Sequence, residues 1–261
     1  MSAANPETVL ITGASSGIGL ELARCFAADG SRLILVARNT AALESLAGEL
    51  RKAHEIETVV LTADLSLSGT PGKIFSELKG RGVVVDVLVN NAGFGAHGMF
   101  SELPLQRQLE MIQVNVAALT ELTGLFLPGM VDRRRGGVLN VASVAGFVPG
   151  PGMAVYYATK SFVLSFSEAL AEELAGAGVK VMALCPGPTA TNFGRVAHAK
   201  DARLTRVGSM SAKEVAVKGH KAFRCGRVVV VSGWRNRLLV LLVRLTPRLL
   251  VRGIVKKLNG F

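Results

Sequence analysis

The stretch that decides the fold is Thr12-Gly13-Ala14-Ser15-Ser16-Gly17-Ile18-Gly19, near the start of the chain. An apolar run ends at Thr12, and a helical pattern of apolar residues begins at Leu20. Glycines in such a turn let backbone amides approach an anion at a helix N-terminus, where the dipole and unpaired N–H groups favour negative charge. A glycine turn after a strand can also be purely steric. The strand before it and the helix after it favour a dinucleotide-binding loop.

The same alternation of strand and helix patterns continues along the chain. Short runs rich in Val, Ile and Leu predict strands near Thr8 to Thr12, Arg32 to Ala37, Thr58 to Ala63, Val83 to Asn90, Val138 to Ala142, Val179 to Cys185 and Arg227 to Val231. Near-continuous apolar strands indicate burial on both faces, and strict alternation with helices indicates parallel pairing. We therefore expect the α/β class: a single doubly wound, Rossmann-like parallel sheet of about seven strands, with helices on both faces.

Length and composition fit one large domain with an added C-terminal segment. The 261 residues are 49% hydrophobic, which excludes disorder as the main state, and three cysteines are too few for a disulfide scaffold. We expect a Rossmann-fold catalytic domain over 1–233, with a substrate-side loop at 189–210, and a basic amphipathic extension over 234–261. The first residues lack a signal-peptide pattern and no window has about 18 uncharged apolar residues, so a cytoplasmic chain without a membrane span is expected.

The positive charge of the chain is concentrated at one end. The formal net charge is +11, but residues 1–194 hold 14 Lys/Arg against 17 Asp/Glu, whereas 195–261 hold 16 against 2. The cations of the C-terminal segment alternate with aliphatic residues, and Trp234 is its only Trp for base stacking. This pattern disfavours a nucleic-acid partner.

The C-terminal segment from Trp234 has an amphipathic pattern. Aliphatic residues from Leu238 to Val255 are interrupted by Arg237, Arg244, Arg248, Arg252 and Lys256, which on a continuous helix fall within an arc of roughly 120°. Pro247 predicts a break into two helices, with the proline in the first turn of the second. Such a pair can lie peripherally on an anionic membrane, cover an apolar substrate cleft or form a subunit interface. The pattern leaves these alternatives open.

Later segments agree, in order, with the short-chain dehydrogenase/reductase family, which the chain resembles over residues 8 to about 191. The glycine loop has that family's Thr-Gly-x-x-x-Gly-x-Gly spacing, and Asn90-Asn91-Ala92-Gly93 resembles its Asn-Asn-Ala-Gly motif. Tyr156 and Lys160 have the spacing Tyr-x-x-x-Lys. By resemblance the cofactor is held by Gly13, Ser15, Ser16, Gly17, Ile18, Gly19, Arg38, Asp64, Leu65, Asn91, Ala92, Gly93, Tyr156, Lys160, Pro186, Gly187, Thr189 and Thr191.

The candidate catalytic residues are Ser143, Tyr156, Lys160 and Asn115. Tyr156 and Lys160 are four residues apart and so share one helix face, where an ammonium favours the phenolate and lowers the phenol pKa from about 10. Tyr156 is then the general acid/base, and Ser143, at the end of a strand, can bond the same substrate oxygen. The resemblance supplies Asn115 as the residue that holds a water linking Lys160 to solvent. Tyr157 misses the spacing and is assigned to packing or to the substrate side.

The end of the second strand indicates NADP rather than NAD. NAD sites usually place a carboxylate there, but this chain has Arg38, which can pair with a 2′-phosphate, and Ser15 can add a hydrogen bond. NAD is the less favoured alternative. The four histidines are dispersed, so no metal site is expected.

These features together predict an NADP-dependent oxidoreductase that interconverts a ketone or aldehyde and an alcohol on an apolar or lipid-like substrate. The alternatives are a non-catalytic NADP(H)-binding sensor and a membrane-surface adaptor. A sensor has no requirement for the intact set of Ser143, Tyr156 and Lys160. The resemblance also implies a homodimer or homotetramer, paired through long helices at about 103–130 and 154–175.

Overall fold

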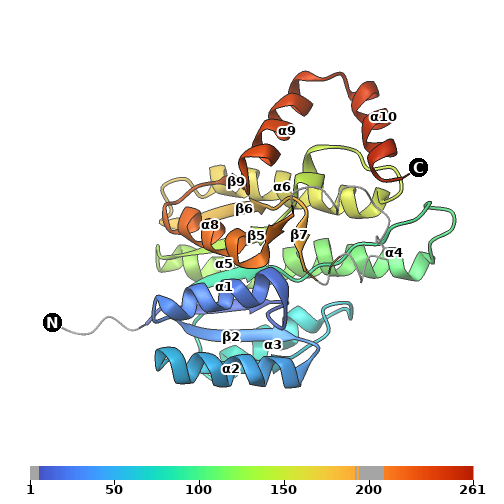
Figure 1. Ribbon diagram of the computed structural model, residues 1–261. Helices are drawn as coiled ribbons and strands as arrows, with labels where there is room; N and C mark the ends of the chain where they lie inside the picture. Colours follow the sequence, from blue (N-terminus) through green and yellow to red (C-terminus); the bar gives the residue numbers. More distant parts are fainter. Residues whose placement is uncertain (1–5, 192, 194–208, 261) are drawn as a thin grey trace.

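The computed structural model describes residues 6–191, 193 and 209–260 of the chain. A parallel sheet of seven strands in the order β3-β2-β1-β4-β5-β6-β9 forms its centre (Figure 1). The predicted doubly wound, Rossmann-like fold is confirmed. The chain order reverses between β1 and β4, so the loops at their carboxyl ends diverge and open a crevice for a ligand.

The seven strands lie where the apolar runs predict them. Their bounds are β1 Thr8–Thr12, β2 Arg32–Ala37, β3 Thr58–Thr62, β4 Val87–Asn90, β5 Gly136–Val141, β6 Val179–Cys185 and β9 Val229–Val231. Three predicted beginnings differ. Val83 and Arg227 donate backbone hydrogen bonds that close the preceding helices, so β4 and β9 begin later, whereas β5 begins at Gly136, before the predicted Val138. A small second sheet pairs β7 Thr189–Ala190 with β8 Met210–Ser211. Residues 192 and 194–208 of the predicted substrate-side loop lie outside the described residues.

Helices cover both faces of the sheet, and the last two, α9 and α10, project beyond it. They are α1 Gly17–Ala28, α2 Thr40–His54, α3 Thr70–Gly80, α4 Leu105–Ile112, α5 Leu119–Asp132, α6 Ala154–Glu173, α8 Ala212–Arg224, α9 Trp234–Leu245 and α10 Arg248–Leu258. A π-helical turn η1 (Gln113–Ala118) joins α4 to α5, and a 3₁₀ turn η2 (Val144–Phe147) follows β5.

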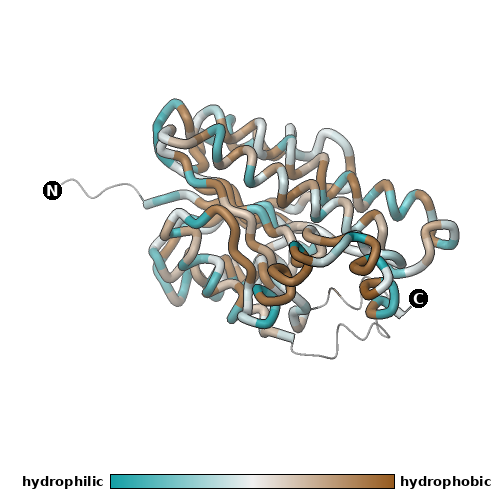
Figure 2. The backbone as a smooth tube through the Cα atoms, turned by 90° about the horizontal axis from the view of Figure 1, so that it is seen from above, coloured by the Kyte–Doolittle hydropathy of each residue, from teal (hydrophilic) through white to brown (hydrophobic). Residues whose placement is uncertain are grey.

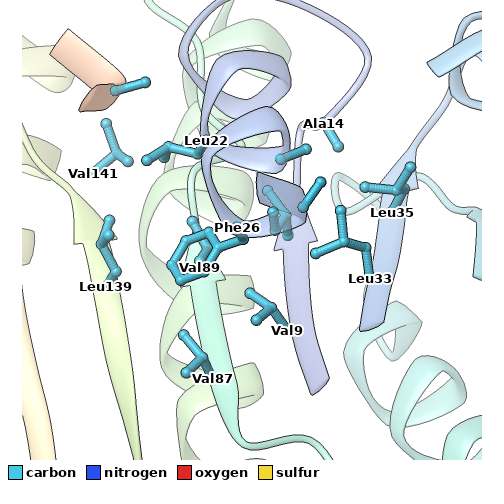
Figure 3. Close-up of a cluster of buried hydrophobic side chains, with 14 of the residues drawn as sticks. Val9, Ala14, Leu22, Phe26, Leu33, Leu35, Val87, Val89, Leu139 and Val141 are labelled. Atoms are coloured by element: carbon cyan, nitrogen blue, oxygen red, sulfur yellow. The ribbon is translucent and has the colours of Figure 1, made fainter. Parts of the chain in front are cut away.

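Successive residues of each strand point to opposite faces and so supply two separate cores. Val9 and Ile11 of β1 pack with α1, α2 and α8, whereas Leu10 packs on the other face with α3 and α5. Figure 3 shows the first core, in which Phe26 of α1 lies over Val87 and Val89 of the neighbouring β4. Burial on both faces explains why the strands carry continuous apolar runs.

The helical stretch Leu105–Asp132, formed by α4, η1 and α5, is long and apolar enough to cross a membrane by length and composition. The sequence analysis finds no window of about 18 uncharged apolar residues, and this stretch does contain charged residues such as Glu110 and Glu121. In the structure the stretch packs on the sheet through Val114, Ala118, Leu122 and Phe126. This burial is what a core helix of an α/β fold requires.

The C-terminal segment forms a hairpin of α9 and α10, which we call the C-terminal hairpin (residues 234–258). It projects from the carboxyl edge of the sheet, and its apolar residues stand out in brown in Figure 2. Pro247 separates the two helices, as the sequence predicts, but it is the N-cap of α10 rather than a residue of its first turn. Val251 and Val255 of α10 are buried against Ala145 and Met153.

Candidate active site

One cavity of about 1260 Å³ lies at the carboxyl edge of the sheet, beneath the C-terminal hairpin. It is lined by the loops after β1 to β6 and by both helices of the hairpin. Nearly every predicted site residue meets there: Gly13, Ser15, Ser16, Gly17, Ile18, Arg38, Asp64, Leu65, Asn91, Ala92, Gly93, Ser143, Tyr156, Lys160, Pro186, Gly187, Thr189 and Thr191. Gly19 and Asn115 do not line the cavity, but each contacts a residue that does: Gly19 lies against Asn91, and Asn115 is hydrogen-bonded to Phe94.

The glycine loop has a backbone that requires glycine. Gly13 and Gly17 have φ of +65° and +59°, in the left-handed region. A Cβ at Gly19 would lie 2.3 Å from Nδ2 of Asn91 and 2.5 Å from the carbonyl oxygen of Gly13. Gly19 therefore lets α1 begin directly against the loop, with its N-terminus toward the cavity.

Thr12 and Asn91 join the glycine loop to the loop after β4. The Thr12 hydroxyl accepts hydrogen bonds from the backbone amides of Asn91 and Ala92, both at 3.0 Å. The Asn91 side chain donates to the carbonyl oxygens of Thr12 (2.8 Å) and Gly13 (3.2 Å). Sequence reasoning assigned Asn91 to the cofactor and overlooked Thr12, although both hold the walls of the crevice.

Tyr156 lies in the first turn of α6, beside Ser143 at the end of β5. Burial raises the pKa of Tyr156 to about 12, although a hydrogen bond with the Ser143 side chain opposes this shift. The sequence-based expectation of a lowered Tyr156 pKa is therefore wrong for the protein alone. The reason is that desolvation of the buried phenol outweighs the hydrogen bond with Ser143, while Lys160 Nζ lies 5.9 Å from the centre of the Tyr156 ring.

Lys160 is a buried cation on the same face of α6. Its ammonium donates a hydrogen bond to the carbonyl oxygen of Val141, at 2.7 Å. Burial lowers the pKa of Lys160 to about 8, because removing the charged form from water is costly. Lys160 is thus mostly protonated at neutral pH and can lose its proton just above it. A buried group with so large a shift in a cavity is a candidate for proton transfer.

Asn115 lies in the π-helical turn η1, a kind of turn that is frequent at functional sites. Its side chain accepts from the amide of Phe94 and donates to the carbonyl oxygen of Phe94 and to the Thr159 hydroxyl. Asn115 thereby positions the loop after β4 against α6. A Cβ at Gly93 would lie 2.9 Å from its Oδ1 and 3.5 Å from Lys160 Nζ, so this loop passes close to both side chains.

Arg38 and Asp64 lie at the other end of the cavity, after β2 and β3. Arg38 is exposed. It follows β2, the strand next to β1, so its loop lies beside the glycine loop that begins at Gly13. Burial raises the pKa of Asp64, but hydrogen bonds from Ser66 and the charge of Arg38 outweigh this and lower it. The Asp64 carboxylate is therefore ionised and the cationic Arg38 is near it.

A buried polar network supports the site, and sequence reasoning missed it. Asn90 donates to Asn140 Oδ1 (2.9 Å) and to the Thr123 hydroxyl (3.1 Å), and Asn140 donates to the Ser167 hydroxyl (2.9 Å). These bonds link β4 and β5 to α5 and α6. The only signal in the sequence is that two asparagines interrupt apolar strands, where a polar residue needs a buried partner.

Tyr157 packs beneath the C-terminal hairpin. Its ring is buried, and its hydroxyl donates to Oδ1 of Asn259 at 3.4 Å. The Asn259 side chain also donates to the carbonyl oxygen of Pro151 at 2.8 Å. The packing role expected for Tyr157 thus takes the form of a contact with the end of α10.

Comparison with known proteins identifies relatives of the chain. Residues 7–202 match the family model of the short chain dehydrogenases. Very-long-chain 3-oxoacyl-CoA reductase from rat is 34% identical over 194 residues, 73% of this chain and 62% of that protein. Dehydrogenase/reductase SDR family member 7B from mouse is 31% identical over 93% of this chain and 75% of that protein. The chain thus spans less than two thirds of the length of the rat relative.

Solved structures show the same fold at similar identity. A short-chain dehydrogenase from Sphingobium yanoikuyae in complex with NADPH superimposes with a TM-score of 0.82 and is 34% identical. The match covers 90% of this chain and 92% of that structure. Other similar structures hold 5-hydroxy-NADP or NAD.

The fit of Gly19 gives a test of the glycine loop. Gly19→Ala should destabilise the fold by roughly 1–3 kcal/mol, because the added methyl group meets backbone that has no room to move. Gly48→Ala is the control, since Gly48 lies in the middle of α2 with nothing within 4 Å of its Cβ position. Helix propensity predicts that Gly48→Ala stabilises by up to about 1 kcal/mol. Urea unfolding measures the stability of both variants. An unchanged unfolding midpoint for Gly19→Ala would contradict the close packing described at Gly19.

Proposed function

Because the chain belongs to the short-chain dehydrogenase family, we propose that it is an NADP-dependent oxidoreductase that interconverts a ketone or aldehyde and an alcohol on an apolar, lipid-like substrate. The observation that carries this proposal is the cavity, whose wall brings Ser143, Tyr156 and Lys160 together with the glycine loop. Residues 1–233 would form the catalytic domain and 234–261 the extension that closes its cleft.

The residues that line the cavity fit an extended dinucleotide. The N-terminus of α1 and the amides of the glycine loop suit a pyrophosphate, and the left-handed glycines leave room for close approach. Asp64 and Leu65 would hold the adenine, and Asn91, Ala92 and Gly93 would form the floor. Pro186, Gly187, Thr189 and Thr191 would hold the nicotinamide end. When bound, the cofactor supplies or accepts a hydride.

Arg38 supports NADP over NAD. It follows β2, where an NAD site would carry an acid, and it lines the cavity. A guanidinium can form charge-assisted hydrogen bonds with a 2′-phosphate, and Ser15, which also lines the cavity, can add a hydrogen bond. The Sphingobium relative, which holds NADPH, agrees with this choice.

Ser143 and Tyr156 would bind the carbonyl oxygen of the substrate. Both residues line the cavity, and a hydrogen bond between their side chains places them next to each other on its wall. Because its pKa is raised, Tyr156 keeps its proton at neutral pH and can give it to the oxygen as the carbonyl is reduced. The Lys160 ammonium would stabilise the resulting phenolate, and Asn115 would hold the water that carries a proton to Lys160. In the reverse direction the same groups would remove the proton from an alcohol.

Apolar walls favour a lipid-like substrate. The C-terminal hairpin forms one side of the cavity. Its lining residues there include Leu238, Leu239, Leu242, Ile254 and Leu258. Aliphatic side chains give a chain or ring system a surface on which to bury, without polar partners. The name of the rat relative, a very-long-chain 3-oxoacyl-CoA reductase, is consistent with such a substrate.

Tyr156→Phe tests the acid/base assignment. The substitution removes the transferable proton and leaves the ring, so reduction of a hydrophobic ketone should slow by roughly 10²–10⁴-fold. NADPH affinity, measured by fluorescence titration, should change little. Tyr157→Phe is the matched control, because it removes only the 3.4 Å bond to Asn259 and should retain most turnover. Near-normal turnover by Tyr156→Phe would contradict the proposal.

The pKa of Lys160 predicts how reduction depends on pH. The folded protein lowers this pKa to about 8, so the ammonium is present below that pH and is lost as the pH rises through it. Tyr156, with a pKa of about 12, remains protonated throughout this range. We expect kcat/KM for reduction to fall as the pH rises above about 8. A profile that stays flat through this range would show that the charge of Lys160 is not required.

Arg38→Ala tests cofactor choice. Loss of a charge-assisted hydrogen bond, worth roughly 1.5–3 kcal/mol, should raise the Kd of NADPH about ten- to a hundredfold. The Kd of NADH, which has no 2′-phosphate, should change by less than about threefold. Arg51→Ala in α2, an exposed arginine paired with Glu44, serves as the control. Equal weakening of both cofactors would show that Arg38 does not select NADP.

A further inference from the structure

The C-terminal hairpin is fixed to the rest of the protein at both ends. At its start, Asn236 donates to the carbonyl oxygen of Ser232 at 2.6 Å and packs against Gly187. At its end, Asn259 is buried and is bonded to Tyr157 and Pro151. Between these anchors the turn around Pro247 lies far from the sheet (Figure 1). The hairpin therefore holds its turn in a defined position.

The two faces of the hairpin differ in what they contact. Its inner face lines the cavity through residues such as Leu239 and Ile254, which are 45% and 55% exposed because the cavity is open. Leu241, Leu245, Leu249 and Leu250 do not line the cavity and are exposed, with Leu245 at 77% and Leu249 at 69%. They lie on both sides of the turn, and together with Arg248 and Arg252 we call them the hairpin tip (Leu241, Leu245, Leu249, Leu250, Arg248 and Arg252). Large exposed apolar clusters of this kind mark interaction sites.

The C-terminal segment as a whole is also strongly cationic. Residues 234–261 contain seven Lys/Arg and no Asp or Glu. Among the described residues, none of the seven forms an ion pair with a carboxylate, and Arg248 and Arg252 lie beside the exposed leucines. A symmetric contact between two copies of this surface would bring like charges together, which disfavours a second copy as its occupant. A partner with acidic groups around an apolar interior fits better.

We propose that the hairpin tip docks the protein on an anionic phospholipid membrane. The leucines would enter the boundary of the acyl chains while Arg248 and Arg252 meet lipid phosphates, the arrangement of an interfacial amphipathic helix. The inner face of the same hairpin lines the cavity, so an apolar substrate dissolved in the bilayer could enter without crossing water. That second statement rests on the proposed function, whereas the docking does not.

Vesicle co-sedimentation of the full chain, without substrate, tests the docking. The probes are vesicles of phosphatidylcholine alone and of phosphatidylcholine mixed equally with phosphatidylglycerol. We expect binding to the mixed vesicles that weakens as ionic strength rises. The double variant Arg248→Glu with Arg252→Glu should lower the partition coefficient at least about twentyfold, because each cation near an anionic surface contributes about fivefold. Leu245→Ser with Leu249→Ser should lower it at least about tenfold.

Matched controls lie elsewhere on the surface. Val84→Ser and Lys218→Glu change an exposed apolar and an exposed cationic residue outside the hairpin, and both should bind like the parent chain. Circular dichroism and NADPH titration verify that each variant is folded. The proposal is overturned if the mixed vesicles are not bound, or if the controls lose as much binding as the tip variants. It is also overturned if the leucine variants abolish an oligomer and leave vesicle binding unchanged.

A separate measurement distinguishes failure of the docking from failure of the proposed function. Turnover of a water-soluble ketone without vesicles depends on the cavity and is independent of the membrane. The tip variants should therefore retain it, whereas their turnover of a long-chain ketone carried in mixed vesicles should fall with the loss of binding. Loss of vesicle binding together with loss of soluble turnover would indicate a damaged cavity and would contradict the proposal.

Discussion

The hydrogen bonds between Thr12 and Asn91 join the loops that leave β1 and β4, at the point where the strand order reverses. The topology makes these loops diverge, and the bonds fix how far apart they lie. The Asn91 side chain also fills the space beside Gly19, so the first turn of α1 has no room for a side chain at that position. Two residues further along, Gly93 passes beside Lys160. The hydrogen bonds between Thr12 and Asn91, with the close approach of Gly93 to Lys160, thus connect the glycine loop to the buried lysine of α6.

Burial acts on Tyr156 and Lys160 in opposite directions on the pKa scale. It raises the pKa of the phenol to about 12 and lowers that of the ammonium to about 8, because each shift favours the neutral form. A protonated phenol is the form that donates to a carbonyl oxygen, so desolvation suits reduction. The phenolate left behind is costly in the same surroundings. Lys160, whose ammonium is held by the Val141 carbonyl in the neighbouring strand, is the charge that can offset that cost.

The sequence predicts the sheet and most of the cavity wall because both follow from local patterns. Strands buried on both faces read as apolar runs, and the motif residues lie at strand ends that parallel topology brings to one edge. The support of the site has no such pattern. Asn140 and Ser167, or Tyr157 and Asn259, are bonded partners 27 and 102 residues apart. Their pairing depends on how helices pack over the sheet, which spacing along the chain does not specify.

The sequence pattern of the C-terminal segment correctly predicts two amphipathic helices, but it does not predict which leucines face the cavity and which face outward. On one continuous helix its cations form an arc opposite an apolar face, which makes membrane contact and closure of a cleft compete for the same leucines. Pro247 divides the segment, and the anchors at Asn236 and Asn259 turn one part of each helix toward the cavity. Leu239 then serves the cavity while Leu245 faces outward. With the leucines divided between two faces, closing the cleft and touching a membrane no longer exclude each other.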